Sequence, residues 1–146
     1  MSISSTSQAT GSPAPSPNTG NPLDYARWAL EQFHPHIALS CSFSAEDITL
    51  LHMMLQVRPD ARVFAIDTGR LHDETYQCAE TVRRQLGVTI EWHFPNREDV
   101  EQLEREQGLF SFRDSVAARR ECCAIRKVEP LARALLGLRA WITGQR

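Results

Sequence analysis

The sequence predicts an α/β fold in which a parallel sheet carries helices on both faces. Short apolar runs typical of strands alternate with longer stretches whose apolar residues recur at helical spacing. Such alternation is typical of strand–helix–strand units, which build parallel sheets. The chain of 146 residues is long enough for one domain with a modest core but too short for two full domains.

The first half of the chain supplies two helices and two strands. The stretch 24–33 places its large apolar residues at helical spacing, and 37–43 is a short apolar run typical of a strand. The stretch 46–57 gathers isoleucine, leucine and methionine on one helical face, and 62–67 is a second apolar run. These stretches predict the order helix, strand, helix, strand.

The second half continues the alternation. A helix is expected at 73–86, and Gly87 suits the left-handed cap that ends many helices. A third strand is expected at 88–94, followed by a charged, solvent-facing helix at 97–107. A helical stretch with two adjacent cysteines comes next, and a fourth strand begins at 140–143. Ligands of such sheets bind beyond the carboxyl ends of the strands.

The composition excludes several classes of protein. A formal net charge of −2 and a pI near 6.2 give no general reason to expect nucleic-acid binding. No apolar run is long enough to span a membrane. Four cysteines are too few for a disulfide scaffold, and the N-terminus does not resemble a secretory signal. A reducing, cytoplasmic location is therefore expected, in which Cys41 and Cys78 fill the core as small hydrophobic residues.

The N-terminal segment differs in composition from the rest of the chain. Residues 1–22 contain no charged side chain and are rich in serine, threonine, glycine and proline. Such a segment buries too little apolar area to order itself, so we expect a disordered tail. Residues 23–146 are expected to form the folded domain.

The adjacent pair Cys122–Cys123 is the strongest local indication of chemistry. On a helix, Arg126 and Lys127 each lie four residues after one of these thiols, and nearby cations favour the thiolate that binds iron. Consecutive helical side chains diverge by about 100°, so both sulfurs reach one site only if the backbone departs from an ideal helix. Pro130 is a plausible cause of such a departure. The alternative is two ordinary buried cysteines.

Two loops after expected strands carry polar residues. In 42–47, Ser44 is expected to cap the following helix while Asp47 reaches back to the chain. The N–H groups at this helix start make an anion site, although a well-capped helix without a ligand explains the same residues. Asp67 and Gly69 follow the second strand and suit a site for a nucleotide's base and ribose, or simply a local turn.

Together these segments resemble the assimilatory sulfonucleotide reductase family, and most closely its iron–sulfur branch, adenylyl-sulfate (APS) reductase. The resemblance covers the chain from about Leu23 onward, and its motifs become specific through their order and spacing. The matching stretches are 42–47, 67–71 with 74–76, 122–131 and 140–146.

The resemblance implies an adenine-nucleotide α-hydrolase-like fold with a modified pyrophosphate loop at the end of the first strand. It also implies a set of substrate-binding residues: Ser42, Phe43, Ser44 and Asp47 in that loop, Asp67, Gly69 and Leu71 at the adenosine, Lys127 between the cluster and the sulfate end, and Arg146.

A cofactor and a reaction follow from the same resemblance. Cys122 and Cys123 match two of the four thiolate ligands of a [4Fe–4S] cluster. The implied reaction reduces APS to sulfite and AMP during sulfate assimilation, which leads to cysteine biosynthesis. A cysteine thiolate attacks the sulfur, and thioredoxin or a related dithiol then releases sulfite. Neither a nucleic acid nor a membrane is an expected partner, and a homo-oligomer is compatible with the sequence.

The chain departs from the family pattern in two places. The second ligand pair, a CxxC, and the nucleophilic cysteine of a Glu-Cys-Gly segment are not found among its residues, and Cys41 and Cys78 lie in the wrong places to replace them. We therefore expect an N-terminal fragment of a longer enzyme, with its nucleophile beyond Arg146 and no reductase activity of its own.

Three alternatives stay open. The first is the same chemistry on the 3′-phosphorylated substrate (PAPS), although family members with that preference lack the cysteine pair. The second is an ATP pyrophosphatase, which would need a Ser-Gly-Gly-x-Asp-Ser loop that 42–47 does not have. The third is a truncated nucleotide-binding module without catalysis.

Overall fold

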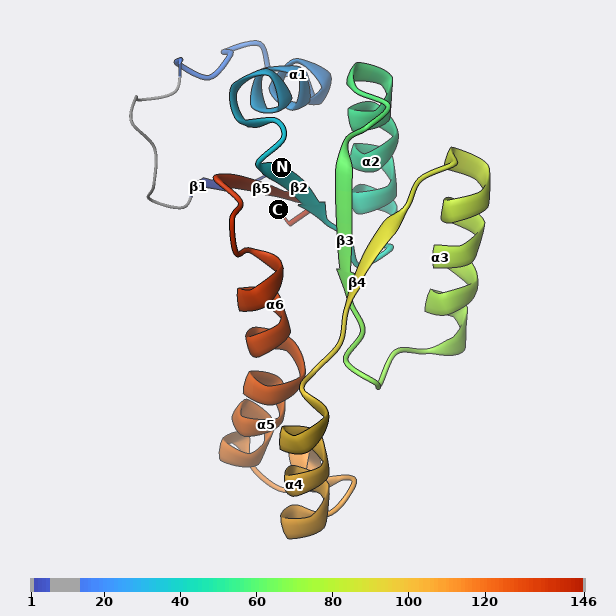
Figure 1. Cartoon of the computed structure of the whole chain (residues 1–146), viewed down its shortest axis with the longest axis vertical. Coiled ribbons are helices and arrows are strands. Elements are labelled where there is room, and N and C mark those ends of the chain that lie inside the picture. The colour runs from blue at the N-terminus through green and yellow to red at the C-terminus, as the bar shows by residue number, and fades with distance from the viewer. Residues whose placement is uncertain (1, 6–13, 146) are drawn as a thin grey trace. The chain divides into compact units, whose positions relative to one another are not determined.

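The structure, a computed structural model, describes residues 2–5 through their backbone and residues 14–145 in full. Its strands form one sheet in the order β1-β5-β2-β3-β4 (Figure 1). Around β2, both neighbouring strands run parallel to it. The predicted α/β class with a parallel sheet is confirmed. The strands are β1 (Ser2–Ser5), β2 (Ile37–Ser40), β3 (Arg62–Ile66), β4 (Ile90–His93) and β5 (Ala140–Thr143).

The chain divides into two compact units, which we describe separately. The first contains the chain up to Ala65, then Asp73–Glu91, then the residues from Gly137. The second contains Ile66–His72 and Trp92–Leu136.

The core of the first unit is centred on β2. Leu39 lies opposite Val63 of β3 and Ile142 of β5 in the strand register, and all three side chains have no exposed surface. A strand that is buried on both faces has a continuous apolar sequence, which explains why these short runs are so easily recognised.

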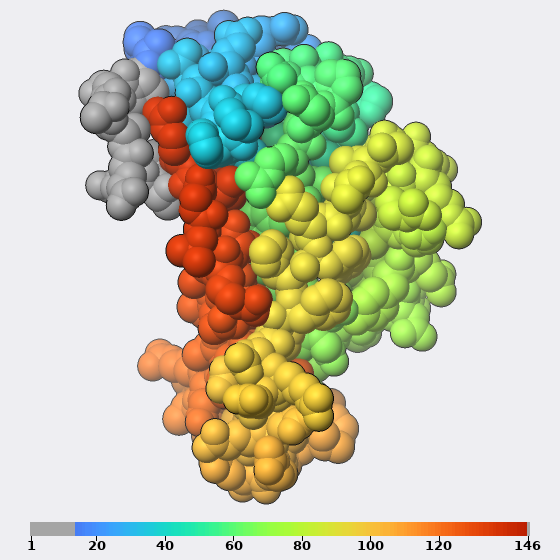
Figure 2. Space-filling model, in the orientation of Figure 1, coloured from blue at the N-terminus to red at the C-terminus, as the bar shows by residue number. Residues whose placement is uncertain are grey.

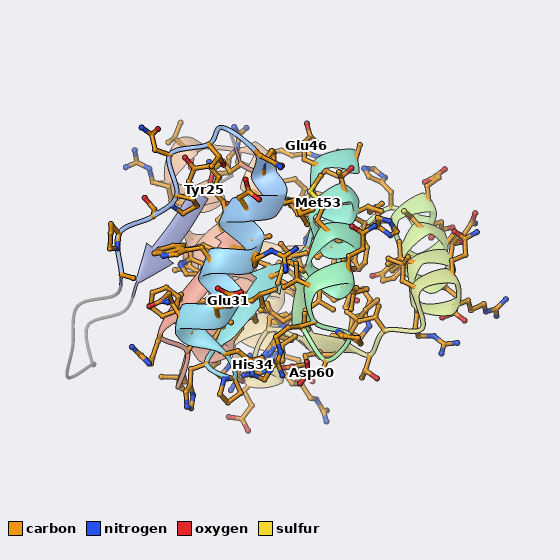
Figure 3. All side chains as sticks on the ribbon, turned by 90° about the horizontal axis from the view of Figure 1, so that it is seen from above. Tyr25, Glu31, His34, Glu46, Met53 and Asp60 are labelled. Carbon is orange, nitrogen blue, oxygen red and sulfur yellow. The ribbon has the colours of Figure 1, made fainter. Side chains whose placement is uncertain are left out.

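Two neighbouring helices pack together in this unit: α1 (Pro22–Phe33) and α2 (Ala45–Val57). Figure 3 shows α1, α2 and α3 in a row, with Glu46 at the start of α2 and Asp60 beyond its other end. His34 and Asp60 meet at that other end, with 3.2 Å between Nε2 and Oδ2. The start of α2 is therefore remote from this pair.

The predicted helix at 73–86 is α3 (Asp73–Leu86), and the predicted strand at its end is β4. Gly87 follows α3 with φ of 63°, so the expected left-handed cap is present. The predicted strand at 88–94 is longer than β4, which covers Ile90–His93. The residues at either end of the apolar run do not pair with the sheet.

The prediction of a disordered tail is wrong for its first residues. Ser2–Ser5 pair with β5 in antiparallel register as strand β1. This pairing uses backbone N–H and C=O groups, so it needs none of the apolar side chains on which the prediction was based. Pro22 begins α1, and Asn21 caps that helix by accepting a hydrogen bond from the Leu23 N–H. The predicted disorder at 6–13 lies outside the described residues.

The second unit consists mainly of helices. Its members are α4 (Arg97–Gln107), a 3-10 turn η1 (Ser111–Arg113), α5 (Val116–Cys123), a π-helical segment η2 (Ala124–Val128) and α6 (Glu129–Ala134). In Figure 2 the gold atoms of α4 lie directly against the orange atoms of the segment that follows it.

Most of α4 faces solvent, as its sequence predicts, but one side does not. Leu103 is buried and Glu104 is largely shielded, with 16% of its side-chain surface exposed. None of the helices in the described part of the chain combines the length and apolar character that a membrane crossing needs.

Candidate functional site

In the first unit, a buried carboxylate organises the loop between β2 and α2. Asp47 is 4% exposed and accepts hydrogen bonds from the N–H and the Oγ–H of Ser42, each 2.7 Å from Oδ2. Its other oxygen, Oδ1, accepts the N–H of Gly144 at 2.9 Å. One side chain therefore connects the end of β2 to the end of β5.

The approach of Gly144 to this carboxylate requires a residue without a side chain. A Cβ on Gly144 would lie 2.5 Å from Oδ1 of Asp47 and 3.0 Å from Cβ of Glu46. Real Cβ atoms do not make contacts this short, so only glycine fits without a shift of the loop. We name Asp47, Ser42 and Gly144 the strand-end junction.

The junction leaves small polar residues at the helix start. Ser42 and Ser44 are exposed, whereas Phe43 is buried and holds an unusual φ of 63°. Ser44 caps α2, since its Oγ accepts the Asp47 N–H at 3.4 Å, as the sequence predicts. A helix start lined by small side chains suits an anion.

Asp47 does reach back to the chain, but its target is Ser42. Both carboxylate oxygens are bound within the strand-end junction. The geometry makes Asp47 a residue that positions this loop, and its place in the substrate-binding loop, which the resemblance implies, stays a prediction.

Cys41 immediately precedes the strand-end junction and is 4% exposed, as its expected role in the core requires. Burial raises the pKa of its thiol to about 12 from an ordinary value of 9.0. Its folded form therefore holds the proton more tightly than its unfolded form.

We expect Cys41 to make the fold sensitive to alkali. Below about pH 9 the thiol is protonated in both the folded and the unfolded state, and its contribution to the free energy of unfolding is complete. As the pH rises from 9 toward 12, this contribution is lost at about 1.4 kcal/mol per pH unit. Urea unfolding of the wild type and of Cys41→Ala between pH 7 and pH 10.5 measures this difference. The wild type should lose stability more steeply above pH 9, and parallel curves would contradict the assignment.

In the second unit, the loop after β3 is built by short-range hydrogen bonds. Asp67 is buried, and its Oδ1 accepts the Gly69 N–H at 2.7 Å. Thr68 accepts the Arg70 N–H through its Oγ1 at 3.2 Å. Gly69 has φ of 69°, a left-handed conformation that favours glycine. The predicted local turn is therefore present, with Leu71 half-buried at its end.

The backbone departs from an ideal helix directly after the cysteine pair, which is the condition for both sulfurs to reach one site. The N–H of Glu129 donates to the carbonyl of Ala124, five residues back, in the π segment η2. Pro130 follows and has no N–H to donate to Arg126, four residues before it. A wide turn at this point relieves the clash that a proline ring makes with that carbonyl.

The two thiols have different surroundings. Cys122 is buried, whereas Cys123 is exposed, as is Lys127. Across the described chain, no group of three or more His, Cys, Asp or Glu side chains could hold a metal ion. These residues alone therefore do not fit a [4Fe–4S] cluster, which needs four thiolates. Arg146 lies outside the described residues.

Two residues of the second unit have roles that the sequence does not indicate. Glu104 is one of many charges on α4, and nothing in the sequence marks it as shielded. Arg126 was expected beside the Cys122 thiol, yet its buried guanidinium binds Glu104 and donates to the Thr68 carbonyl at 2.9 Å. Gly144 of the first unit lies within a recognised motif, but its close approach to Asp47 could not be foreseen.

Comparison with known proteins agrees on one family. The model described as "Phosphoadenosine phosphosulfate reductase domain" matches residues 36–146. The solved structure of phosphoadenylyl-sulfate (PAPS) reductase from Candida auris, a phosphate complex, has a TM-score of 0.72 and 26% identity. That match covers 86% of this chain and 61% of the other.

Similar curated proteins are named as adenylyl-sulfate reductases. The 5′-adenylylsulfate reductase 3, chloroplastic, of Arabidopsis thaliana is 48% identical over 86% of this chain and 27% of its own length. The adenosine 5′-phosphosulfate reductase of Pseudomonas aeruginosa is 45% identical over 86% of this chain and 46% of its own. The chain thus spans between about a quarter and a half of these relatives. It belongs to the phosphoadenosine phosphosulfate reductase domain family.

Proposed function

We propose that this chain is the nucleotide-binding part of an adenylyl-sulfate reductase. The observation that carries the proposal is the identity of 45–48% to proteins named as such reductases, across 86% of the chain. The cysteine pair beside η2 supports APS over PAPS as substrate, since it matches the iron–sulfur branch.

The first unit supplies an anion site in this proposal. Ser42 and Ser44 are exposed at the start of α2, where backbone N–H groups and the helix dipole favour the phosphate and sulfate of APS. Phe43, with its φ of 63°, makes the turn between these two serines, and Asp47 stabilises the loop by accepting the hydrogen bond of the Ser42 hydroxyl. In the second unit, the turn formed by Asp67 and its neighbours supplies the adenosine site.

The proposed reaction transfers a sulfonate group before reducing it. A cysteine thiolate attacks the sulfur of APS, the bond from sulfur to the phosphate oxygen breaks, and AMP leaves. Attack by a dithiol of the thioredoxin type on the enzyme's cysteine sulfur then expels sulfite, and the dithiol is oxidised to a disulfide. The attacking cysteine is not one of the four in this sequence, whose surroundings match other roles.

We also propose that Cys122 and Cys123 contribute two thiolates to a [4Fe–4S] cluster in the whole reductase. The other two ligands would come from residues outside this sequence. The cytoplasm is the proposed compartment, because two adjacent cysteines that form no disulfide need a reducing environment. The Arabidopsis thaliana relative is named as chloroplastic.

Binding and turnover test the proposal separately. Titration calorimetry of the 146-residue chain should give a lower Kd for APS than for PAPS or ATP, and an assay with APS and reduced thioredoxin should yield no sulfite. Tighter binding of PAPS would favour the related reductase, and sulfite production would refute the assignment of the nucleophile to another segment. Binding of none of these nucleotides would overturn the proposed function.

A further inference from the structure

Within the second unit, one carboxylate is shared by two arginines from different segments. Oε1 of Glu104 lies 2.8 Å from Nη2 of Arg70, which belongs to the loop after β3. The same oxygen binds Nη2 of Arg126, which belongs to η2. The side chains of Glu104 and Arg126 are only 16% and 9% exposed, so this is not a solvated surface pair. We name these three residues the shared-carboxylate cluster.

Arg126 touches the backbone of the loop as well as Glu104. Its Nη1 donates to the Thr68 carbonyl at 2.9 Å. A Cβ placed on Gly69 would lie 3.2 Å from the same Nη1, so the guanidinium lies close against the peptide of Gly69. The planar guanidinium thus binds the loop with one nitrogen and Glu104 with another, which a lysine ammonium cannot reproduce in the same geometry.

Arg70 attaches the loop to the chain beyond α4. It donates to the carbonyl of Leu109 and places its guanidinium over the ring of Phe112, 4.7 Å from the ring centroid. Two arginines therefore fix the loop: Arg126, which belongs to the cysteine-bearing segment, and Arg70, which belongs to the loop itself. The guanidinium groups of both bind Glu104.

The charge of Glu104 is what makes this arrangement stable. Among the residues that the structure describes, Nε of both arginines and Oε2 of Glu104 are buried and have no hydrogen-bond partner, so the hydrogen bonds alone leave the cluster incompletely satisfied. Without the negative charge, the buried guanidinium of Arg126 and that of Arg70, whose side chain is 28% exposed, would lie near each other with no counterion. Removal of one member of a buried ion pair is far more disruptive than its surface equivalent.

We propose that Glu104 is a positioning residue, which through Arg70 and Arg126 holds the Asp67–Leu71 loop in its binding conformation. This inference rests on the proposed function, because the loop is the proposed adenosine site. It adds a role for α4, which the sequence presents as a solvent-facing helix. Glu104 acts through the arginines and does not itself touch the nucleotide.

Amide hydrogen exchange and APS binding test the proposal on the intact 146-residue chain. In Glu104→Gln, the amides of Gly69 and Arg70 should exchange about tenfold faster or more, since their turn loses its support. Affinity for APS should fall by a similar factor. Glu101→Gln is the matched control, because Glu101 lies one turn earlier on α4 and forms exposed ion pairs with Arg97 and Arg105. It should leave both quantities within about twofold of the wild type.

Each outcome decides between a positioning role and its alternatives. Unchanged exchange at Gly69 in Glu104→Gln would overturn the proposal, and so would equally faster exchange throughout β2 and α2, which indicates general destabilisation. If the wild type does not bind APS, the proposed function fails while loop exchange still decides the role of Glu104. Should Glu104→Gln not fold, Arg126→Lys provides the same measurement, with faster exchange at Gly69 expected and wild-type exchange refuting the proposal.

Discussion

Asp47→Asn should lower the free energy of unfolding by about 2–4 kcal/mol. The carboxylate accepts three hydrogen bonds from Ser42 and Gly144, and it is almost fully buried. An asparagine has only one oxygen, so its NH₂ group would face a donor at one of these positions. Urea unfolding monitored by circular dichroism measures the loss.

A surface aspartate provides the control for this experiment. Asp60 has 60% of its side-chain surface exposed and pairs with Arg58. Asp60→Asn should leave the unfolding midpoint unchanged, because water replaces the lost contact. Equal midpoints for Asp47→Asn and the wild type would show that the strand-end junction is not held by this carboxylate.

Gly144→Ala should destabilise the fold by about 1–3 kcal/mol through overlap alone. The added methyl group would lie 2.5 Å from Oδ1 of Asp47, so either the end of β5 or the start of α2 must move. The prediction separates this steric effect from backbone strain, because Gly144 does not occupy the left-handed region.

The test is a double-mutant cycle with Asp47→Ala. If the methyl group clashes with the carboxylate, Asp47→Ala removes the obstacle, and the double variant should be more stable than the sum of the single effects predicts. Additive effects would mean that the carboxylate is not what opposes the methyl group, and that Cβ of Glu46 or the backbone N of Asp47, 3.0 and 3.1 Å away, opposes it instead. Gly137→Ala, with open space around its Cβ position and φ of 79°, reports the cost of backbone strain without overlap.

The regular elements were predictable because their sequence periods are undisturbed. The helix at 97–107 and the strand at 140–143 were placed at the residues where α4 and β5 occur. Each has a clear local boundary, such as Gly108 with its φ of 83° after α4. Local signals of this kind act over a few residues, and sequence alone contains them.

The features that could not be predicted from the sequence all depend on contacts between residues far apart in the chain. β1 pairs with β5 through backbone groups that every residue has, so its serines gave no sign of a strand. Glu104 is shielded by Arg70, which lies before it in the chain, and by Arg126, which lies after it. The other glutamates of α4 are exposed, so the sequence does not distinguish Glu104 from them. That Asp47 reaches back to the chain was predicted, but its bond to Gly144, 97 residues further on, was not. Tertiary contacts decided each case.

The π segment after Cys123 has a consequence for insertions and deletions. The hydrogen bond from Glu129 to Ala124 spans five residues, whereas an α-helical hydrogen bond spans four, so this turn contains one extra residue. Deleting Ala124 would remove this extra residue and bring the helix back to its regular period, so Arg126 would stand at a different angle around the axis relative to the cysteines. The deletion would remove one small residue and no charged or thiol side chain, yet Arg126 would no longer face Glu104. In this segment the number of residues is as much a functional property as their identity.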